Sequence, residues 1–395
     1  MGVRVELSAM RNHAALTLAV VLLSLLAACG SGSDESSTNS EAFRVGLEAP
    51  LSGDQAVLGE GMLRGAELAA ERINDDGGIS GRDVEVVPID DAAEPETGVQ
   101  AAEAAIDDGL DGVVGPYNSS VGEETLPLYI EAGLVPIRLT SDTSTSGQGL
   151  TLQPMSEQIA PVASRALTDW LDAKTVAIAY DPTPGYTLTV AKAVKRSLEK
   201  AGVEVTAYEQ VEPGKDDYAA VVDRVSAGEP DVIYAAVYFP EGGLIAKEIH
   251  ERDLQSQCVA DYASYDSGFV ETAGVAAARA CPVVGVPAPA DFRGSEARLA
   301  EYREKFGEEP GTWSPYTYDS LNFLAAGIEA ADGTDAAALE KALENLKGWR
   351  GWTGSVSIDP ETGNRDPATV VIARAASDGR LHVDSDWAKA VGAPY

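Results

Sequence analysis

The chain has 395 residues, with 63 Asp and Glu against 29 Lys and Arg, so its formal net charge is −34. This surplus of carboxylates repels phosphate backbones and anionic lipid headgroups, which excludes nucleic acid as a partner. A chain of this length exceeds what one hydrophobic core usually supports, so two lobes are expected.

The first 28 residues are typical of a targeting segment. Arg11 precedes an apolar run, Ala14–Leu26, that is too short to span a bilayer but fits a secretory signal peptide. The following Ala-Ala-Cys ending at Cys29 resembles the lipobox of bacterial lipoproteins, which implies cleavage before Cys29 and lipid on its sulfur. Residues 1–28 are then a lipoprotein signal peptide and 29–42 a flexible tether. We expect the protein outside the cytoplasm, lipid-anchored to the outer face of the cell membrane. The alternative is a plain signal peptide with an incidental cysteine.

From Phe43 onward, short apolar runs alternate with segments of helical periodicity, and the pattern restarts after Pro154. The expected strands are Phe43–Leu47, Val84–Ile89, Val113–Val114, Leu134–Leu139, Thr175–Tyr180, Val203–Tyr208, Asp231–Val237, Gln257–Asp261, Val283–Val286, Val356–Ile358, Val370–Ala375 and Arg380–Val383. The expected helices are Gly61–Ile73, Ala101–Asp108, Val121–Ala132, Ala160–Leu171, Thr187–Ala201, Tyr218–Ala227, Leu244–Arg252, Phe269–Val275, Ser295–Phe306, Tyr316–Ala330 and Ala336–Asn345. Such alternation predicts an α/β fold with a parallel sheet in each lobe.

Two polar loops follow successive strands of the first lobe. Gly115–Ser120 comes after the first strand and Thr140–Thr143 after the second, with a helix between them. A right-handed βαβ unit places both loops side by side at the carboxyl ends of the strands, where α/β sheets bind ligands. We expect Glu123 and Glu124 in the first turn of the helix. The loops predict half of a small-molecule pocket; the alternative is that they are ordinary helix caps.

Catalytic and metal chemistry has little support in the sequence. Beyond the targeting segment the only histidines are His250 and His382, so neither a His-based triad nor a His-rich metal site is expected, and no cofactor or metal is predicted. Gly59–Gly65 resembles a dinucleotide loop but has one residue too many, and we interpret it as the sequence that opens a helix. Cys258 and Cys281 form an even pair in an exported chain, which predicts a disulfide; two buried thiols are the alternative.

Five segments together resemble the type I periplasmic binding proteins of the leucine/isoleucine/valine-binding family. They are Pro50–Asp91, Gly112–Ser120, Leu134–Thr143, Ala236–Gly243 and Trp313–Leu321. The resemblance implies two doubly wound parallel-sheet lobes joined by three crossovers, with ligand bound in the cleft between them. By position the crossovers fall near Gln153–Met155, Pro287–Ala290 and Trp352–Ser355. The N-terminal lobe is then 43–153 with 288–353, and the C-terminal lobe 154–287 with 354–395.

The resemblance also implies a set of ligand contacts. The expected contacts of a ligand carboxylate are Asn118, Ser119 and a second loop. That loop is Ser141-Asp142 or Asp142-Thr143, because its alignment leaves both registers open. The aromatic walls are Tyr186, Tyr238 and Trp313. Relatives hold the ligand ammonium with a carboxylate where this chain has Tyr262, with Asp261 one residue earlier. The partner of the ammonium is therefore Asp261 or Asp142, or the ligand lacks an ammonium group.

The implied function is binding rather than catalysis. We expect a monomeric solute-binding protein that captures a small polar ligand, an amino acid of branched-chain type by family default, and delivers it to an ABC permease and its ATPase. One alternative is a sensor of the same fold for amides, urea-like compounds or small carboxylates that signals to a membrane receptor. An extracytoplasmic hydrolase is a third interpretation, disfavoured because no activated nucleophile is recognisable.

Overall fold

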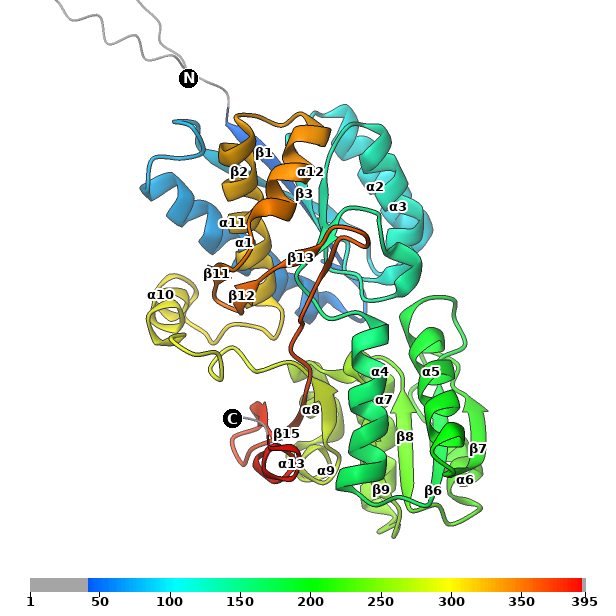
Figure 1. Ribbon diagram of the computed structural model, residues 1–395. Coiled ribbons are helices and arrows are strands. Elements are labelled where there is room, and N and C mark those ends of the chain that lie inside the picture. Colours follow the sequence, from blue (N-terminus) through cyan, green and yellow to red (C-terminus); the bar gives the residue numbers. More distant parts are fainter. Residues whose placement is uncertain (1–41, 393–395) are drawn as a thin grey trace, which may run out of the picture. The chain divides into compact units, whose positions relative to one another are not determined.

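The computed structural model describes residues 42–392, so the predicted signal peptide and Cys29 lie outside the described part. The chain forms two seven-stranded sheets, each flanked by helices (Figure 1). The strands of the first sheet are β1 (Phe43–Ala49), β2 (Val84–Asp90), β3 (Gly112–Val114), β4 (Pro136–Arg138), β5 (Leu150–Thr151), β13 (Ile358–Asp359) and β14 (Asn364–Arg365). The strands of the second are β6 (Thr175–Tyr180), β7 (Glu204–Gln210), β8 (Val232–Ala236), β9 (Gln257–Ala260), β10 (Val283–Gly285), β15 (Val371–Ala375) and β16 (Leu381–Val383).

The helices divide between the two lobes, with a small hairpin beside the first. The first lobe carries α1 (Ala56–Asp75), α2 (Pro95–Asp107), α3 (Ser119–Glu131), η1 (Thr143–Thr145), α10 (Glu296–Phe306), α11 (Ser314–Ala331), α12 (Ala336–Asn345) and the hairpin of β11 (Trp349–Gly351) and β12 (Gly354–Val356). The second carries α4 (Ser156–Arg165), η2 (Ala166–Trp170), α5 (Tyr186–Lys200), α6 (Ala219–Ser226), α7 (Phe239–Glu251), η3 (Tyr262–Ser264), α8 (Ser267–Ala273), α9 (Val275–Ala280) and α13 (Ser385–Val391).

The first five strands of each lobe share one topology, while the outer strand next to them is parallel in the first sheet (β14 on β5) and antiparallel in the second (β15 on β10). The first has the order β13-β14-β5-β4-β3-β1-β2 and the second β16-β15-β10-β9-β8-β6-β7, and the central neighbours in both are parallel. All five residues of β8 are buried, as is typical of a parallel strand covered on both faces. The predicted α/β fold with two doubly wound lobes is therefore confirmed.

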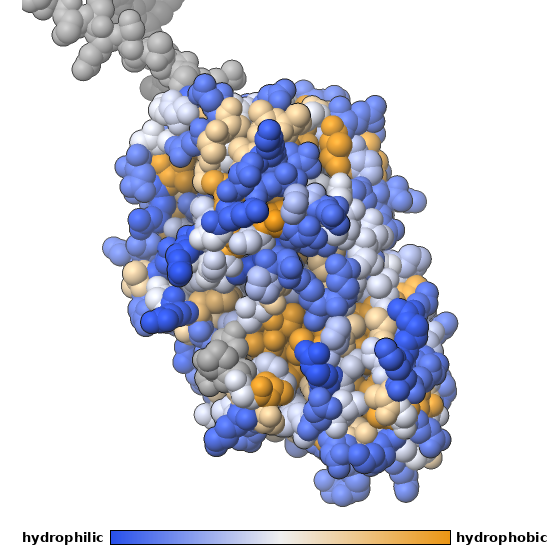
Figure 2. Space-filling model, viewed as in Figure 1, coloured by the Kyte–Doolittle hydropathy of each residue, from blue (hydrophilic) through white to orange (hydrophobic). Residues whose placement is uncertain are grey.

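The surface reflects the composition of the chain. Hydrophilic residues cover most of the face shown in Figure 2. No helix among residues 42–392 is both long and apolar enough to cross a membrane.

The glycine-rich stretch that resembles a nucleotide loop is helical, as predicted, but it lies inside α1 rather than at its opening. A Cβ at Gly65 would lie 2.3 Å from the carbonyl oxygen of Ser314 on α11, so only glycine permits this approach of the two helices. The hydroxyl of Ser314 donates to the carbonyl of Gly61 (2.6 Å), and that of Thr317 to the carbonyl of Met62 (2.8 Å). These glycines therefore serve helix packing, not phosphate binding.

Several helices begin earlier than predicted. Helix α1 begins at Ala56 rather than Gly61, and α7 at Phe239 rather than Leu244. Helix α3 begins at Ser119, so the prediction that Glu123 and Glu124 lie in its first turn is wrong. The first turns of these helices contain Gly or Pro, which are typical of loops. Both residues are also compatible with a first turn, because its backbone N–H groups have no partner within the helix.

The third predicted crossover, Trp352–Ser355, is also wrong. Strand β14 pairs with β5 in the first sheet, and β13 pairs with β14, so the chain passes to the second sheet only between Arg365 and Val371. The buried guanidinium of Arg365 donates to the carbonyls of Leu152 (3.2 Å), Thr353 (2.9 Å) and Ser355 (2.8 Å). These bonds hold β13 and β14 to the first lobe. The sequence did not reveal this because a strand of two residues is too short to show a periodic pattern.

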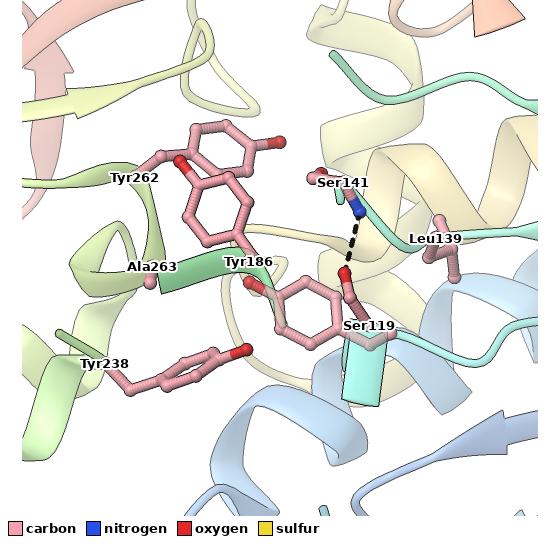
Figure 3. Close-up of a pocket in the computed structure, with 8 residues that line it drawn as sticks. Ser119, Leu139, Ser141, Tyr186, Tyr238, Tyr262 and Ala263 are labelled. Carbon is pink, nitrogen blue, oxygen red and sulfur yellow. Dashed lines mark hydrogen bonds between the residues drawn. The ribbon is translucent and has the colours of Figure 1, made fainter. Parts of the chain in front are cut away.

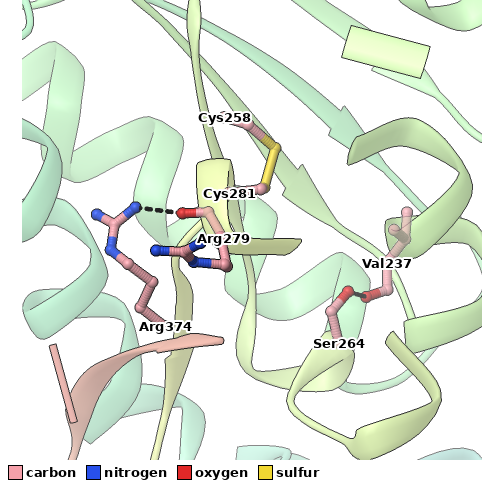
Figure 4. Close-up of a disulfide and its surroundings, with 6 residues drawn as sticks. All are labelled: Val237, Cys258, Ser264, Arg279, Cys281 and Arg374. Carbon is pink, nitrogen blue, oxygen red and sulfur yellow. Dashed lines mark hydrogen bonds between the residues drawn. A yellow bond between two sulfur atoms is a disulfide. The ribbon is translucent and has the colours of Figure 1, made fainter. Parts of the chain in front are cut away.

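The predicted disulfide is present in the second lobe. Cys258 on β9 is bonded to Cys281, which lies between α9 and β10 (Figure 4). Both residues are buried. Nearby, Arg374 on β15 donates to the carbonyl of Arg279 (2.7 Å), which holds β15 to the end of α9.

Removing this disulfide is expected to lower the free energy of unfolding. The bond closes a loop with a sequence separation of 23 residues, and loop-closure entropy gives about 3 kcal/mol for a loop of this size. Urea unfolding with and without reductant measures the loss. The double variant Cys258→Ser/Cys281→Ser is the control, because its midpoint should not respond to reductant. Equal midpoints for the oxidised and reduced wild type would contradict the expectation.

Candidate functional site

The two polar loops meet as predicted. Ser119 opens α3 directly after the loop that follows β3, and Ser141 lies just beyond β4. The hydroxyl oxygen of Ser119 accepts a hydrogen bond from the backbone N–H of Ser141 (3.3 Å; Figure 3) and another from the N–H of Asp142 (3.1 Å). The site thus presents two loop N–H groups and a hydroxyl at the amino-terminal end of a helix, a combination suited to a carboxylate.

A small pocket lies between these loops and the second lobe. Four of its eight lining residues are tyrosines, and Figure 3 shows those of the second lobe on the side opposite Ser119 and Ser141. The lining residues are Tyr117, Ser119, Leu139, Ser141, Tyr186, Tyr238, Tyr262 and Ala263. The cavity volume is about 10 Å³, about the space of one water molecule. The walls must therefore separate before any larger ligand enters.

A buried tryptophan packs against two of the tyrosines that line the pocket. Trp313, which is 1% exposed, has its ring centroid 5.4 Å from that of Tyr117 and 5.3 Å from that of Tyr262. The hydroxyl of Tyr262 donates to Oε1 of Gln153 (3.3 Å), which also accepts from the hydroxyl of Ser141 (3.3 Å). Trp313 and Gln153 therefore connect the first-lobe loops to the wall formed by the second lobe.

A buried carboxylate directly precedes two residues of the pocket wall, Tyr262 and Ala263. Asp261 follows β9 and is 0% exposed; it accepts hydrogen bonds from the hydroxyl of Tyr234 and from the N–H of Ala263 (3.3 Å). Burial raises the pKa of Asp261, while the hydrogen bond from Tyr234 acts in the opposite direction. Burial also raises the pKa of Tyr186, and the charge of Asp261 raises it further. Asp261 is thus a carboxylate held in an apolar, tyrosine-lined environment.

The second acidic candidate has a partly structural role. Asp142 is buried, and its Oδ1 accepts from the N–H of Ser144 (2.8 Å), which caps the short helix η1. Its Oδ2 is buried and has no hydrogen-bond partner within the described residues. Thr143 is exposed on the same loop.

The structure places the nine predicted contacts unequally. Ser119, Ser141, Tyr186 and Tyr238 line the small pocket, and Asn118 lines a larger groove beside it. Trp313, Asp261, Asp142 and Thr143 line neither cavity. The role of all nine in ligand binding stays a prediction.

Sequence reasoning missed four lining residues as contacts. Tyr117 stands in the polar loop itself and Leu139 is the last apolar residue before the next loop, so both positions carried a signal. Tyr262 was recognised only as a departure from the expected carboxylate, and Ala263 has no distinctive chemistry. Among residues 42–392, no group of three or more His, Cys, Asp or Glu is placed to hold a metal ion.

Comparison with known proteins identifies the family. The model of the periplasmic binding protein family matches residues 42–380. A Leu/Ile/Val-binding protein homolog of Brucella abortus is 28% identical over 332 residues, which cover 83% of this chain and 89% of the relative.

Solved structures show the same fold. The branched-chain amino acid transporter substrate-binding protein LivJ of Streptococcus pneumoniae, in complex with isoleucine, has a TM-score of 0.78 at 24% identity and covers 87% of this chain and 99% of its own. A solute-binding protein of an ABC transporter from Rhodopseudomonas palustris, in complex with 3,4-dihydroxybenzoic acid, has a TM-score of 0.76 at 22% identity and covers 87% and 95%.

These matches agree with the observed topology. The family consists of extracytoplasmic ligand-binding proteins of ABC transporters and is not a family of enzymes. The chain therefore belongs to the periplasmic binding protein family, among the type I proteins related to the leucine/isoleucine/valine-binding proteins.

Proposed function

We propose that this protein captures an amino acid in the pocket between its lobes and delivers it to an ABC permease, while lipid on Cys29 holds it at the outer face of the membrane. The observation that carries the proposal is the convergence of the Ser119 hydroxyl with the N–H groups of Ser141 and Asp142 at the start of α3. Three donors at this position fit the carboxylate of a zwitterion.

The carboxylate would replace contacts that the protein makes with itself. In the closed pocket, the oxygen of Ser119 accepts from both loop N–H groups. A ligand carboxylate takes over those N–H donors and receives the hydroxyl proton of Ser119 as a third hydrogen bond. The partial positive charge at the amino-terminal end of α3 favours the same anion.

The ammonium group is assigned to Asp261. This carboxylate is fully buried next to two lining residues, Tyr262 and Ala263, so an incoming cation would offset its desolvation. The tyrosine rings of the closed pocket exclude water, which strengthens each charged contact. Asp142, with one buried oxygen that has no partner, is the alternative that a variant has to exclude.

The relatives support an amino acid ligand without fixing its side chain. The Brucella protein is named for leucine, isoleucine and valine, and the Streptococcus protein was solved with isoleucine. The Rhodopseudomonas protein holds an aromatic acid on the same fold. The branched-chain amino acids are therefore the first ligands to test.

Thermal unfolding of the full-length protein in detergent tests this proposal. The protein is unfolded and refolded to remove carried-over ligand, then heated with each common amino acid, with amides and with small carboxylates. A ligand at 100 times its Kd stabilises the folded state by about 2.7 kcal/mol, so at least one amino acid should raise Tm in a saturable manner. The absence of a shift with every amino acid, even where an amide or a carboxylate gives one, would contradict the proposal.

A further inference from the structure

A larger groove opens beside the small pocket. Its volume is about 640 Å³, within the usual range of small-molecule sites. It is lined by the loops that follow β1, β2 and β3 in the first lobe and β6, β7 and β8 in the second, all at the carboxyl ends of parallel strands. Tyr238 lines both cavities, and Ser119 of the pocket lies between Asn118 and Ser120 of the groove. The groove is therefore a continuation of the proposed ligand site.

The charged residues that line this groove are all acidic. Asp54 and Glu94 come from the first lobe and Asp181 and Glu241 from the second, and no Lys, Arg or His is among the lining residues. Asp181 is only 5% and Glu241 only 8% exposed, so these two differ from the solvated carboxylates that cover an acidic protein. Burial raises the pKa of Glu241, backbone hydrogen bonds act in the opposite direction, and the charges of Asp181 and Asp54 add to the rise. Backbone N–H groups of Gly214 and Thr183 donate to Glu241 (3.0 Å) and Asp181 (2.8 Å), but no cationic side chain in the lining balances their negative charge.

The same groove contains a buried side-chain amide whose oxygen receives no hydrogen bond from residues 42–392. Asn118 is 3% exposed, and its Nδ2 donates to Oε1 of Gln55 (3.1 Å). Its Oδ1 is buried without a hydrogen-bond partner among the described residues. An unsatisfied buried acceptor destabilises the protein, and a ligand N–H group would supply the missing hydrogen bond.

We propose that this groove binds a cationic group at the end of the ligand side chain, so that the preferred ligands are amino acids with a second positive charge, such as lysine, ornithine or arginine. The inference rests on the proposed function, since the pocket must hold the α-carboxylate and α-ammonium. The side chain then passes Tyr238 into the groove. There its ammonium or guanidinium group lies among Asp181, Glu241 and the oxygen of Asn118.

Calorimetric titration of the full-length protein with lysine and norleucine isolates the contribution of the charge, because norleucine has the same carbon chain without the terminal ammonium. Lysine is expected to bind at least about 10-fold more tightly, and added salt should reduce this ratio. In the variant Asp181→Asn/Glu241→Gln the ratio should fall towards one. Glu124→Gln, an exposed acid on α3 outside the groove, is the matched control and should keep the ratio.

The outcomes separate the two proposals. Binding of norleucine with no tighter binding of lysine overturns the cationic subsite and leaves the proposed function standing. A lysine preference that persists in the double variant overturns the assignment to this groove. Failure of every amino acid to bind overturns the proposed function, and the subsite with it.

Discussion

Asp261→Asn is expected to weaken amino acid binding by about 30-fold or more. Removing one partner of a buried, hydrogen-bonded charge pair costs about 2–5 kcal/mol, and 1.4 kcal/mol is a factor of ten. Asn keeps an oxygen for the hydroxyl of Tyr234, so the change removes charge with little loss of packing. Calorimetry on the refolded wild type and variant measures the ratio of their Kd values.

The pH dependence gives the same assignment a second test. Burial raises the pKa of Asp261 above its ordinary value of 3.8, and the protonated acid cannot pair with an ammonium group. Affinity should therefore fall as the pH is lowered through this raised pKa, and the fall should be absent in Asp261→Asn. Asp142→Asn is the comparison variant. If it loses binding while Asp261→Asn does not, the assignment of the ammonium to Asp261 is contradicted.

Asp91→Asn is expected to stabilise the protein at pH 8 by up to about 4 kcal/mol. Asp91, directly after β2, is fully buried, and burial raises its pKa from 3.8 to about 7. The folded state therefore holds a proton that the unfolded chain releases near pH 4, so the free energy of unfolding falls as the pH rises from about 4 to 7. About three pKa units at 1.36 kcal/mol each give the stated figure. The neutral amide avoids this loss.

The neighbourhood of Asp91 adds to the effect. Glu48 on β1 is also fully buried; its pKa is raised by burial and then by the charge of Asp91, while Tyr129 and Thr125 on α3 act in the opposite direction. Thr125 donates its hydroxyl to Oε2 of Glu48 (3.1 Å). Neutralising Asp91 therefore also removes a repulsion from Glu48.

Asp90→Asn is the matched control for Asp91→Asn, because the adjacent carboxylate behaves in the opposite way. Partial burial of Asp90 would raise its pKa, but hydrogen bonds from Ser52, Ala92 and Leu51 lower it overall. Its charge is thus stabilised in the folded protein, and Asp90→Asn should lower the free energy of unfolding at pH 8. Urea unfolding between pH 4 and pH 8 measures both variants. A destabilised Asp91→Asn at pH 8 would contradict the buried-proton account.

The fold was largely predictable because parallel strands appear as short apolar runs separated by helical periodicity. The start of α1 was not predictable from the sequence. Glycines usually interrupt a helix, but Gly61 and Gly65 lie within α1 because they pack against Ser314 and Thr317, about 250 residues away. The place of β14 depends on the buried guanidinium of Arg365, which no local pattern reveals.

The site was predictable where the chemistry is local. The two polar loops were identified because they follow adjacent strands, a property of the sequence alone, and the family resemblance then singled out Ser119 and Ser141 within them. The acidic groove was not, because a chain with 63 Asp and Glu residues gives no sign that Asp181 and Glu241 are buried. The closeness of Tyr262 to Trp313 likewise depends on the packing of two segments about 50 residues apart.

Calorimetry with three compounds tests the central claim most directly. Leucine, its deaminated acid 4-methylpentanoate and its decarboxylated amine 3-methylbutylamine are titrated into the refolded full-length protein. Our account predicts that leucine binds and that each analogue binds at least about 30-fold more weakly, because one lacks the ammonium for Asp261 and the other the carboxylate for Ser119 and its loop. Binding of 4-methylpentanoate as tight as that of leucine would contradict it.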